Sequence, residues 1–276
     1  MIVWMATSEM VGAGGSASVP PVEQRAAVGE QPPGGSTHPL STVALIGGTG
    51  RLGSALAARF ALAGHEVVIG SRDTARAELA ASTLAQSISG VDGSRVRGAE
   101  NAAAAAAAEV VVITVPFDAQ DATLRGLAGA VKERVVVSTA VPVHYAKGAV
   151  PTHIEVEQGS ASEQVAALLP GARVVGALHT VSSATLSRLD RDLDADVLIT
   201  GDDPAAKTVV AELLASLPGI RVVDGGPLRN SRYVEQLTVL LLAINMRVRR
   251  NTGVRITNLP DELALLSAPA AQGRAT

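Results

Sequence analysis

The sequence contains no cysteine, so disulfide bonds, thiolate nucleophiles, cysteine-ligated metals and iron–sulfur clusters are all excluded. Aromatic residues are scarce as well: they make up 2% of the 276 residues, as one Trp, two Tyr and two Phe. Such a chain lacks the stacking surfaces that bind single-stranded nucleic acids, and its core has to be built from Ala, Val, Leu and Ile. The net charge of −3, with no strongly basic tract, argues against nucleic acid as the main partner.

Long hydrophobic runs are also lacking. The richest apolar stretch, residues 102–117, is interrupted by Glu109 and Pro116, and Leu240–Ile244 is far shorter than the roughly 20 residues of a membrane span. No basic segment precedes the apolar residues 1–5, as a secretory signal would require. We therefore expect a cytoplasmic protein without a membrane partner.

Apolar residues nevertheless make up 47% of the chain, enough for a sizeable core. Residues 1–40 are rich in Gly, Ala, Ser and Pro, a composition that predicts a disordered tail. Residues 261–276 are expected to form a second tail, in which a short helix over 261–266 is one option. Between the tails we expect one large domain over residues 41–226 and a helical segment over 227–260.

The large domain alternates short apolar runs with helical patterns. Strands are expected over residues 42–46, 66–69, 110–115, 134–138, 173–177, 196–200 and 221–224, and helices over 53–63, 74–86, 119–129, 162–169 and 204–217, with Asn101 capping a further alanine-rich helix. Strands that are apolar at nearly every position are buried on both faces, as in a parallel sheet covered by helices. The pattern predicts a Rossmann-like, doubly wound α/β fold with a mostly parallel sheet and a small C-terminal helical part.

A long helical stretch over residues 230–250 is strongly apolar at Leu237–Ile244. Two interpretations fit this pattern. The helix either packs between subunits or lies in the core of its own chain.

A glycine cluster supplies the first chemical signal. It matches the pattern G-x-G-x-x-G with Gly48, Thr49, Gly50, Arg51, Leu52 and Gly53. The cluster stands between an expected strand and an expected helix, where glycine lets backbone N–H groups approach a pyrophosphate at a helix N-terminus. This context predicts dinucleotide binding, and the alternative is an ordinary tight turn. With Gly47, the same segment also matches the pattern G-x-x-G-x-x-G, so membership of a second group of Rossmann proteins remains an alternative.

The second signal lies at the end of the second expected strand. NAD-binding proteins usually have a carboxylate there for the ribose 2′-hydroxyl, but this chain has Ser71 and Arg72, with Arg76 four residues further on. A guanidinium offers a fork of donors that suits a phosphate. We therefore expect a 2′-phosphate site and NADP as the cofactor; the alternative is a pair of solvated arginines at a helix start.

Four segments together resemble the NADP-dependent reductases of the 8-hydroxy-5-deazaflavin coenzyme F420. They are Ala44–Arg72, Thr114–Phe117 (the pattern T-V-P-aromatic), Ala177–Thr180 (A-L-H-T) and Asp224–Arg232 (D-x-G-P-L-x-N-S-R). The resemblance spans roughly residues 42–250, and its last two segments are much more specific than the glycine pattern.

The resemblance implies an NADP-binding domain over 41–226 and a deazaflavin pocket and dimer contact in 227–260. It implies that the NADP phosphates bind at Gly48, Thr49, Gly50, Arg51, Leu52 and Gly53, the 2′-phosphate at Ser71, Arg72 and Arg76, and the nicotinamide beside Val115, Pro116 and Phe117. His179 would lie at the deazaflavin ring, with Arg232 and Thr238 near the same pocket. On residues alone, His179 could equally be a structural residue of a turn and Arg232 a surface cation.

Some positions depart from the family pattern. Arg51 stands in place of Asn, Gln236 in place of Ser, and His144 and Tyr145 in place of smaller residues. These departures affect the deazaflavin pocket more than the NADP site.

The expected activity is direct hydride transfer between C4 of NADP(H) and C5 of coenzyme F420 in a cytoplasmic homodimer. This chemistry needs neither a nucleophile nor a metal, because the two cofactors carry the hydride; no histidine pair has metal-ligand spacing. Two alternatives remain: an NADPH-binding sensor, and an NADP-dependent reductase of another small substrate.

Overall fold

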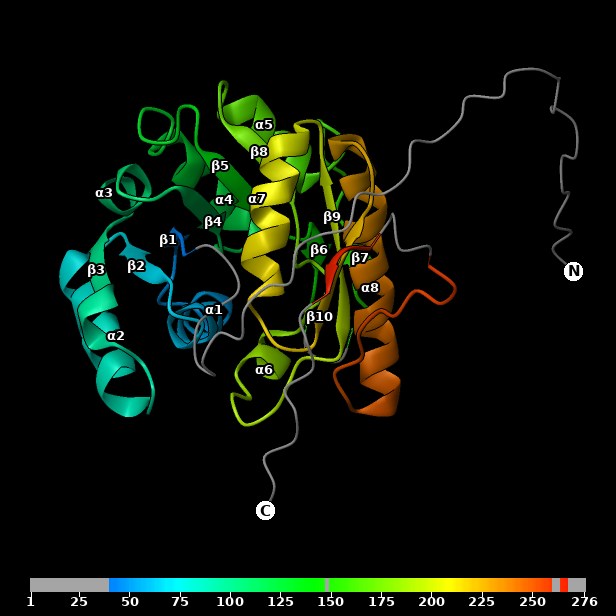
Figure 1. Cartoon of the computed structure of the whole chain (residues 1–276). Helices are drawn as coiled ribbons and strands as arrows, with labels where there is room; N and C mark the ends of the chain where they lie inside the picture. The colour runs from blue at the N-terminus through cyan, green and yellow to red at the C-terminus, as the bar shows by residue number, and fades with distance from the viewer. Residues whose placement is uncertain (1–39, 147–148, 260–263, 268–276) are drawn as a thin grey trace, which may run out of the picture. The chain divides into compact units, whose positions relative to one another are not determined.

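The computed structural model describes residues 40–146, 149–259 and 264–267. Apart from Leu40, the tail expected over residues 1–40 lies outside this part of the chain, as does most of the tail expected over 261–276. Within the described ranges, a single large sheet is flanked by helices, with α2 (Thr74–Ser87) at one side and α8 (Ser231–Val248) at the other (Figure 1). No helix in these ranges is long and apolar enough to cross a bilayer.

The large sheet has nine strands within the described residues. Their spatial order is β11 (Ala264–Ser267), β10 (Ile220–Asp224), β9 (Ala195–Gly201), β8 (Arg173–Gly176), β5 (Val135–Ser138), β4 (Val110–Ile113), β1 (Thr42–Ile46), β2 (Glu66–Ser71) and β3 (Val96–Glu100). All neighbours from β3 to β8 are parallel, as are β9 and β10. The predicted mostly parallel, Rossmann-like sheet is confirmed.

Two strand pairs are antiparallel, β8 with β9 and β10 with β11. The segment between β8 and β9 contains only the four-residue helix α6 (Ser183–Leu186). A parallel connection needs a crossover of a dozen or more residues, usually a helix packed on the sheet. An antiparallel pair needs no such crossover helix, and here only α6 lies between β8 and β9.

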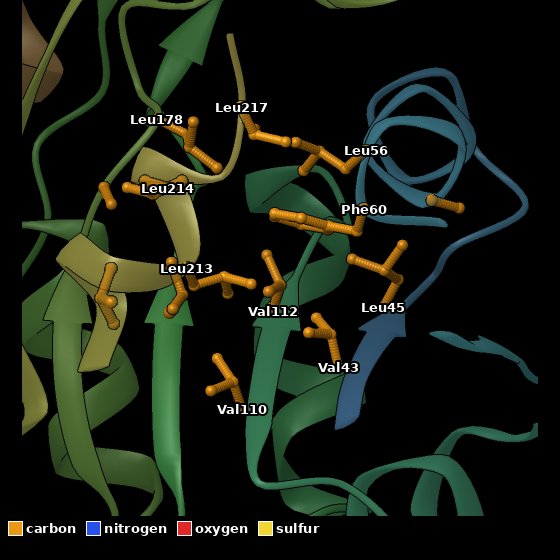
Figure 2. Packing of buried hydrophobic residues seen from close by; sticks show 14 of the residues in the cluster. Val43, Leu45, Leu56, Phe60, Val110, Val112, Leu178, Leu213, Leu214 and Leu217 are labelled. Atoms are coloured by element: carbon orange, nitrogen blue, oxygen red, sulfur yellow. The ribbon is translucent and has the colours of Figure 1, made fainter. Parts of the chain in front are cut away.

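The remaining helices pack on the two faces of the sheet. They are α1 (Arg51–Leu62), α3 (Asn101–Ala106), α4 (Phe117–Arg125), α5 (Ala161–Leu168) and α7 (Pro204–Ala215). Successive residues of β1 alternate between the two buried clusters that result: Val43 and Leu45 belong to one, Ala44 and Ile46 to the other. Figure 2 shows the first cluster, in which Phe60 of α1 lies over β1 and β4. Burial of alternate residues on opposite faces explains the unbroken apolar runs.

Several elements were not predicted. The edge strand β3, with the sequence VRGAE, has no apolar run; it pairs with β2, and a Cβ on Gly98 would lie 2.2 Å from the Ala77 carbonyl carbon of α2. A two-stranded hairpin, β6 (Val143–His144) with β7 (Thr152–His153), is too short to give a periodic signal. The helix considered over residues 261–266 is wrong, because 264–267 form β11 on the outer edge of β10.

Candidate functional site

A cavity of about 860 Å³ opens at the carboxyl ends of β1, β2 and β4. It is lined by Gly47, Thr49, Gly50, Ser71, Arg72, Asp73, Arg76, Glu100, Asn101, Thr114, Val115, Pro116, Ala119, Ala122, Thr123, Gly126 and Leu127. The volume falls in the range of small-molecule sites, and this edge of the sheet is where open α/β folds bind their ligands. The glycine loop and the end of β2, which sequence patterns had linked to a dinucleotide, thus share one cavity.

The glycine loop depends on two glycines for different reasons. Gly47 has φ +73°, a conformation that favours glycine, and a Cβ there would lie 2.5 Å from Val115 Cγ1. A Cβ on Gly53 would lie 2.5 Å from the Cα of Gly48, so only glycine lets α1 pack this closely on the loop. Gly50 at the N-cap provides no side-chain cap, which leaves the first N–H groups of α1 for an anion.

Two arginines stand at the β2 end of this cavity. Arg72 and Arg76 are exposed, and neither forms an ion pair with another residue of the described ranges. The nearby carboxylate of Asp73 accepts a hydrogen bond from the backbone N–H of Arg76 (3.3 Å) and caps α2. Ser71 Oγ in turn accepts from the Asp73 N–H at 3.2 Å. The acidic group is therefore engaged in capping, while both guanidinium groups remain available to a phosphate.

Asn101 has a role that the sequence did not indicate. It was expected to cap the alanine-rich helix, but Glu100 does so by accepting from the Ala102 N–H at 2.8 Å. The Oδ1 of Asn101 instead accepts a hydrogen bond from the Gly47 N–H at 3.3 Å. On the other side of the loop, Thr114 Oγ1 donates to the Ile46 carbonyl at 2.8 Å. These two contacts fix the loop that the glycines make possible.

A second cavity, of about 710 Å³, adjoins the first. The two share Gly50, Thr114, Val115 and Pro116. The second is lined further by Arg51, Leu52, Phe117, Asp118, Thr139, Ala140, Val141, Val143, His144, Tyr145, Ile154 and Ser183. Its walls are mainly apolar, with a few charged or polar groups, as is typical of small-molecule sites.

His179 lies elsewhere, in a buried polar cluster. Its Nε2 is 3.4 Å from Ser162 Oγ and 3.8 Å from a carboxylate oxygen of Glu235, and both side chains of the latter pair are fully buried. Burial lowers the pKa of His179 to about 4, so the ring is neutral at pH 7. The pattern A-L-H-T had placed His179 at the deazaflavin, but no cavity described above is lined by it.

Glu235 was not singled out from the sequence. Its carboxylate accepts hydrogen bonds from the N–H groups of Ala161 (2.8 Å) and Ser162 (3.1 Å) and from Ser162 Oγ (2.9 Å), at the N-terminus of α5. Burial raises the pKa of Glu235 to about 7, although these hydrogen bonds oppose the shift. The carboxylate thus joins α8 to α5 through donors that lie 74 and 73 residues away.

Thr238 and Arg232 belong to the same region of α8. Thr238 Oγ1 donates to the His179 carbonyl at 3.0 Å, and Arg232 Nη2 lies 2.9 Å from both carboxylate oxygens of Glu163. The structure therefore joins Thr238 to His179 directly, and it pairs Arg232 with the same helix α5 that Glu235 contacts. Neither described cavity includes them among its lining residues.

The fold, the glycine loop and the unpaired arginines define a dinucleotide-binding protein of the Rossmann type. A family model described as "NADP oxidoreductase coenzyme F420-dependent" matches residues 42–142. The F420-dependent NADP reductase of Methanothermobacter thermautotrophicus is 42% identical over 80% of this chain and 96% of its own length. The chain belongs to the F420-dependent NADP reductase family.

Other relatives agree with this assignment. The F420-dependent NADP reductase of Methanocaldococcus jannaschii is 37% identical over 79% of this chain and 98% of its own length. A crystal structure from Arthrobacter sp. FB24, described as an F420-dependent NADP reductase, is 30% identical, with a TM-score of 0.67 over 79% of this chain and all (100%) of that one. The similarity thus extends well beyond residues 42–142, into the part of the chain that contains His179 and α8.

Proposed function

We propose that this chain transfers a hydride directly between C4 of NADP(H) and C5 of coenzyme F420. The observation that carries the proposal is the shared wall: Thr114, Val115 and Pro116 line both cavities. A nicotinamide in one cavity and a deazaflavin in the other would meet at these residues. Both cofactors are hydride carriers, so the protein has only to place the two rings in contact and keep them oriented.

NADP(H) occupies the first cavity in this proposal. The N–H groups at the start of α1 bind the pyrophosphate, as at other helix N-termini. Ser71, Arg72 and Arg76 hold the 2′-phosphate, which is supported by two guanidinium groups without carboxylate partners in the described part of the chain. Val115 and Pro116 then lie beside the nicotinamide.

The deazaflavin occupies the second cavity. The side chains of Phe117, Arg51 and Leu52 line the second cavity and not the first, so in this proposal they face the acceptor, while the backbone N–H groups of Arg51 and Leu52 remain with the pyrophosphate. Direct contact of His179, Arg232 or Thr238 with the deazaflavin stays a prediction. Their buried or ion-paired positions favour an indirect role, in which they hold α8 against α5 and β8.

We also propose that the protein is a cytoplasmic homodimer, with the NADP-binding domain over 41–226 and the dimer contact in the helical segment over 227–260. Tyr233, Leu240, Ile244 and Val248 are 66%, 57%, 37% and 49% exposed, and their spacing of seven and four residues puts them on one face of α8. A second copy of α8, with the same apolar face, would cover these side chains.

The direct test uses NADPH deuterated at the transferred position of C4 together with oxidised F420. The absorbance of the oxidised deazaflavin should fall as NADPH is consumed, and mass spectrometry should find the label at C5. The label should not exchange with water, because a hydrogen moved as hydride is never acidic. Solvent hydrogen at C5 would contradict direct transfer. NADPH binding without F420 reduction at any pH would favour the sensor or a reductase of another substrate.

A further inference from the structure

The side chain of Arg51 has surroundings that its motif does not predict. As the fourth residue of the glycine pattern it was assigned to the NADP phosphates. In the structure it is the first residue of α1 and lines the second cavity only. Its side chain is exposed, and no hydrogen bond or ion pair joins its guanidinium to another residue of the described ranges.

The position of Arg51 is electrostatically unfavourable for the fold. A cation in the first turn of a helix faces the positive end of the helix dipole. The core side of α1 is formed by Ala, Leu and Phe residues further along the helix and does not involve Arg51. Arg51 therefore contributes little to stability, and a role toward a ligand explains it better.

Arg51 is the source of positive charge in the second cavity, as a comparison with the other polar groups that line it shows. Of the Lys and Arg residues that the structure describes, none but Arg51 lines this cavity. Asp118 lies there as well, but it stands in the first turn of α4, where that helix favours its negative charge, and it forms no ion pair with Arg51. His144 and Tyr145 add polar atoms, and the remaining walls are mostly apolar.

We propose that Arg51 is a specificity-determining residue that binds an anionic group of the deazaflavin coenzyme. This inference rests on the proposed function. F420 has anionic oxygens on its ring, at the 8-hydroxyl, and on its tail, as a phosphodiester and carboxylates. In the reaction, two electrons and one hydrogen leave C4 of NADPH and join C5, and a proton from water completes the reduced deazaflavin. The guanidinium of Arg51 stabilises an anionic oxygen of F420 by a charge-assisted hydrogen bond, because the mostly apolar walls of the cavity cannot do so.

The experiment compares Arg51→Ala and Arg51→Lys with the wild-type protein as full-length chains. Fluorescence titration should show that Arg51→Ala raises the Kd of F420 about 10- to 30-fold, because solvent partly screens the exposed charge of Arg51. The Kd of NADPH should stay within about twofold, and Arg51→Lys should recover part of the F420 affinity because it keeps the charge. Arg97→Ala, at an exposed site on β3 that lines neither cavity, removes the same charge and should change neither Kd.

A second ligand distinguishes whether Arg51 binds the anionic oxygen of the F420 ring or the anionic groups of its tail. The deazaflavin nucleoside without phosphate or glutamate retains the ring and its 8-hydroxyl. If Arg51 binds the ring, Arg51→Ala weakens both ligands equally and raises the pKa at which the bound oxidised ring ionises, measured by its absorbance. If Arg51 binds the tail, only F420 is weakened.

Two results would overturn the inference. An equal increase in the Kd of NADPH and of F420 would indicate that the Arg51 side chain binds the NADP phosphates. Unchanged F420 affinity and turnover in Arg51→Ala would show that Arg51 does not bind F420. The proposed function would not be affected by that result, because it depends on the activity of the wild-type protein. A wild-type protein that neither binds nor reduces F420 would defeat both.

Discussion

The choice of NADP over NAD should depend on Arg72 and Arg76. Both line the first cavity at the end of β2 and neither is paired with a carboxylate in the described residues. A hydrogen bond to a charged group contributes about 1.5–3 kcal/mol. Solvent screens exposed charges, so we expect Arg72→Ala near the lower end, about 10- to 30-fold in the Kd of NADPH. The double variant with Arg76→Ala should reach about 100-fold.

These substitutions should leave the fold intact. Arg72 lies in the turn between β2 and α2, outside the helix. At position 76 alanine is the best helix former, and it keeps the backbone N–H that the cap of α2 uses. Neither guanidinium has an ion-paired carboxylate in the described ranges that would lose its partner. The free energy of unfolding should therefore change by no more than about 0.5 kcal/mol, the usual range for surface substitutions.

Calorimetric titration of NADPH and NADH measures the effect. NADH has no 2′-phosphate, so its Kd should change less than about twofold by this argument. Arg97→Ala is the matched control, because Arg97 is exposed and lines neither cavity. Equal weakening of NADPH and NADH would refute the reasoning, since it would mean that Arg72 supports the site without binding the phosphate.

Three further predictions test other parts of the structure. Gly53→Ala should lower NADPH affinity and destabilise the fold by roughly 1–3 kcal/mol, because its Cβ would meet the Gly48 backbone; Gly129→Ala, with open space around it, should change neither quantity in thermal unfolding and titration. Leu240→Glu should convert the proposed dimer to a monomer in sedimentation, whereas Leu79→Glu, at a 69% exposed site on α2, should not. Burial raises the pKa of Glu235 to about 7 and lowers that of His179 to about 4, so their contributions to stability oppose each other between pH about 4.5 and 6.5. In Glu235→Gln only the His179 contribution remains, and the free energy of unfolding should rise with pH across this window by up to about 1.4 kcal/mol per pH unit in denaturant titrations; a flat profile would contradict the buried, neutral state of His179.

The sequence predicted those features that depend on neighbouring residues. The strands over residues 42–46 and 135–138 are apolar at almost every position because both of their faces are buried, and this pattern is visible without the fold. The glycine loop and the two arginines after β2 lie within a few residues of an expected strand end. Their meeting in one cavity follows from the parallel arrangement of β1 and β2.

Features that depend on distant residues could not be predicted in this way. The hydrogen bond from the Gly47 N–H to Asn101 joins residues 54 apart, and no local spacing encodes it. No local pattern encodes the antiparallel direction of β9, and the edge strand β3 has a side-chain pattern typical of a loop. Arg51 shows a further limit: its motif predicts phosphate binding, but its side chain lines the second cavity, which we propose for the acceptor.

The buried cluster around Glu235 gives the A-L-H-T segment a structural role, although this segment lines neither of the two described cavities. A carboxylate without hydrogen bonds would be costly at this depth, but Glu235 receives two backbone N–H groups and a hydroxyl from α5. These hydrogen bonds fix the position of α8 along α5. Thr238 also joins α8 to the His179 carbonyl, at 3.0 Å. The opposite face of α8 presents Leu240 and Ile244 to solvent. The helix α8 thus contacts the end of β8 with one face and presents the other face where we propose the partner subunit. A substitution at His179 or Glu235 should therefore weaken the dimer contact before it weakens NADP binding.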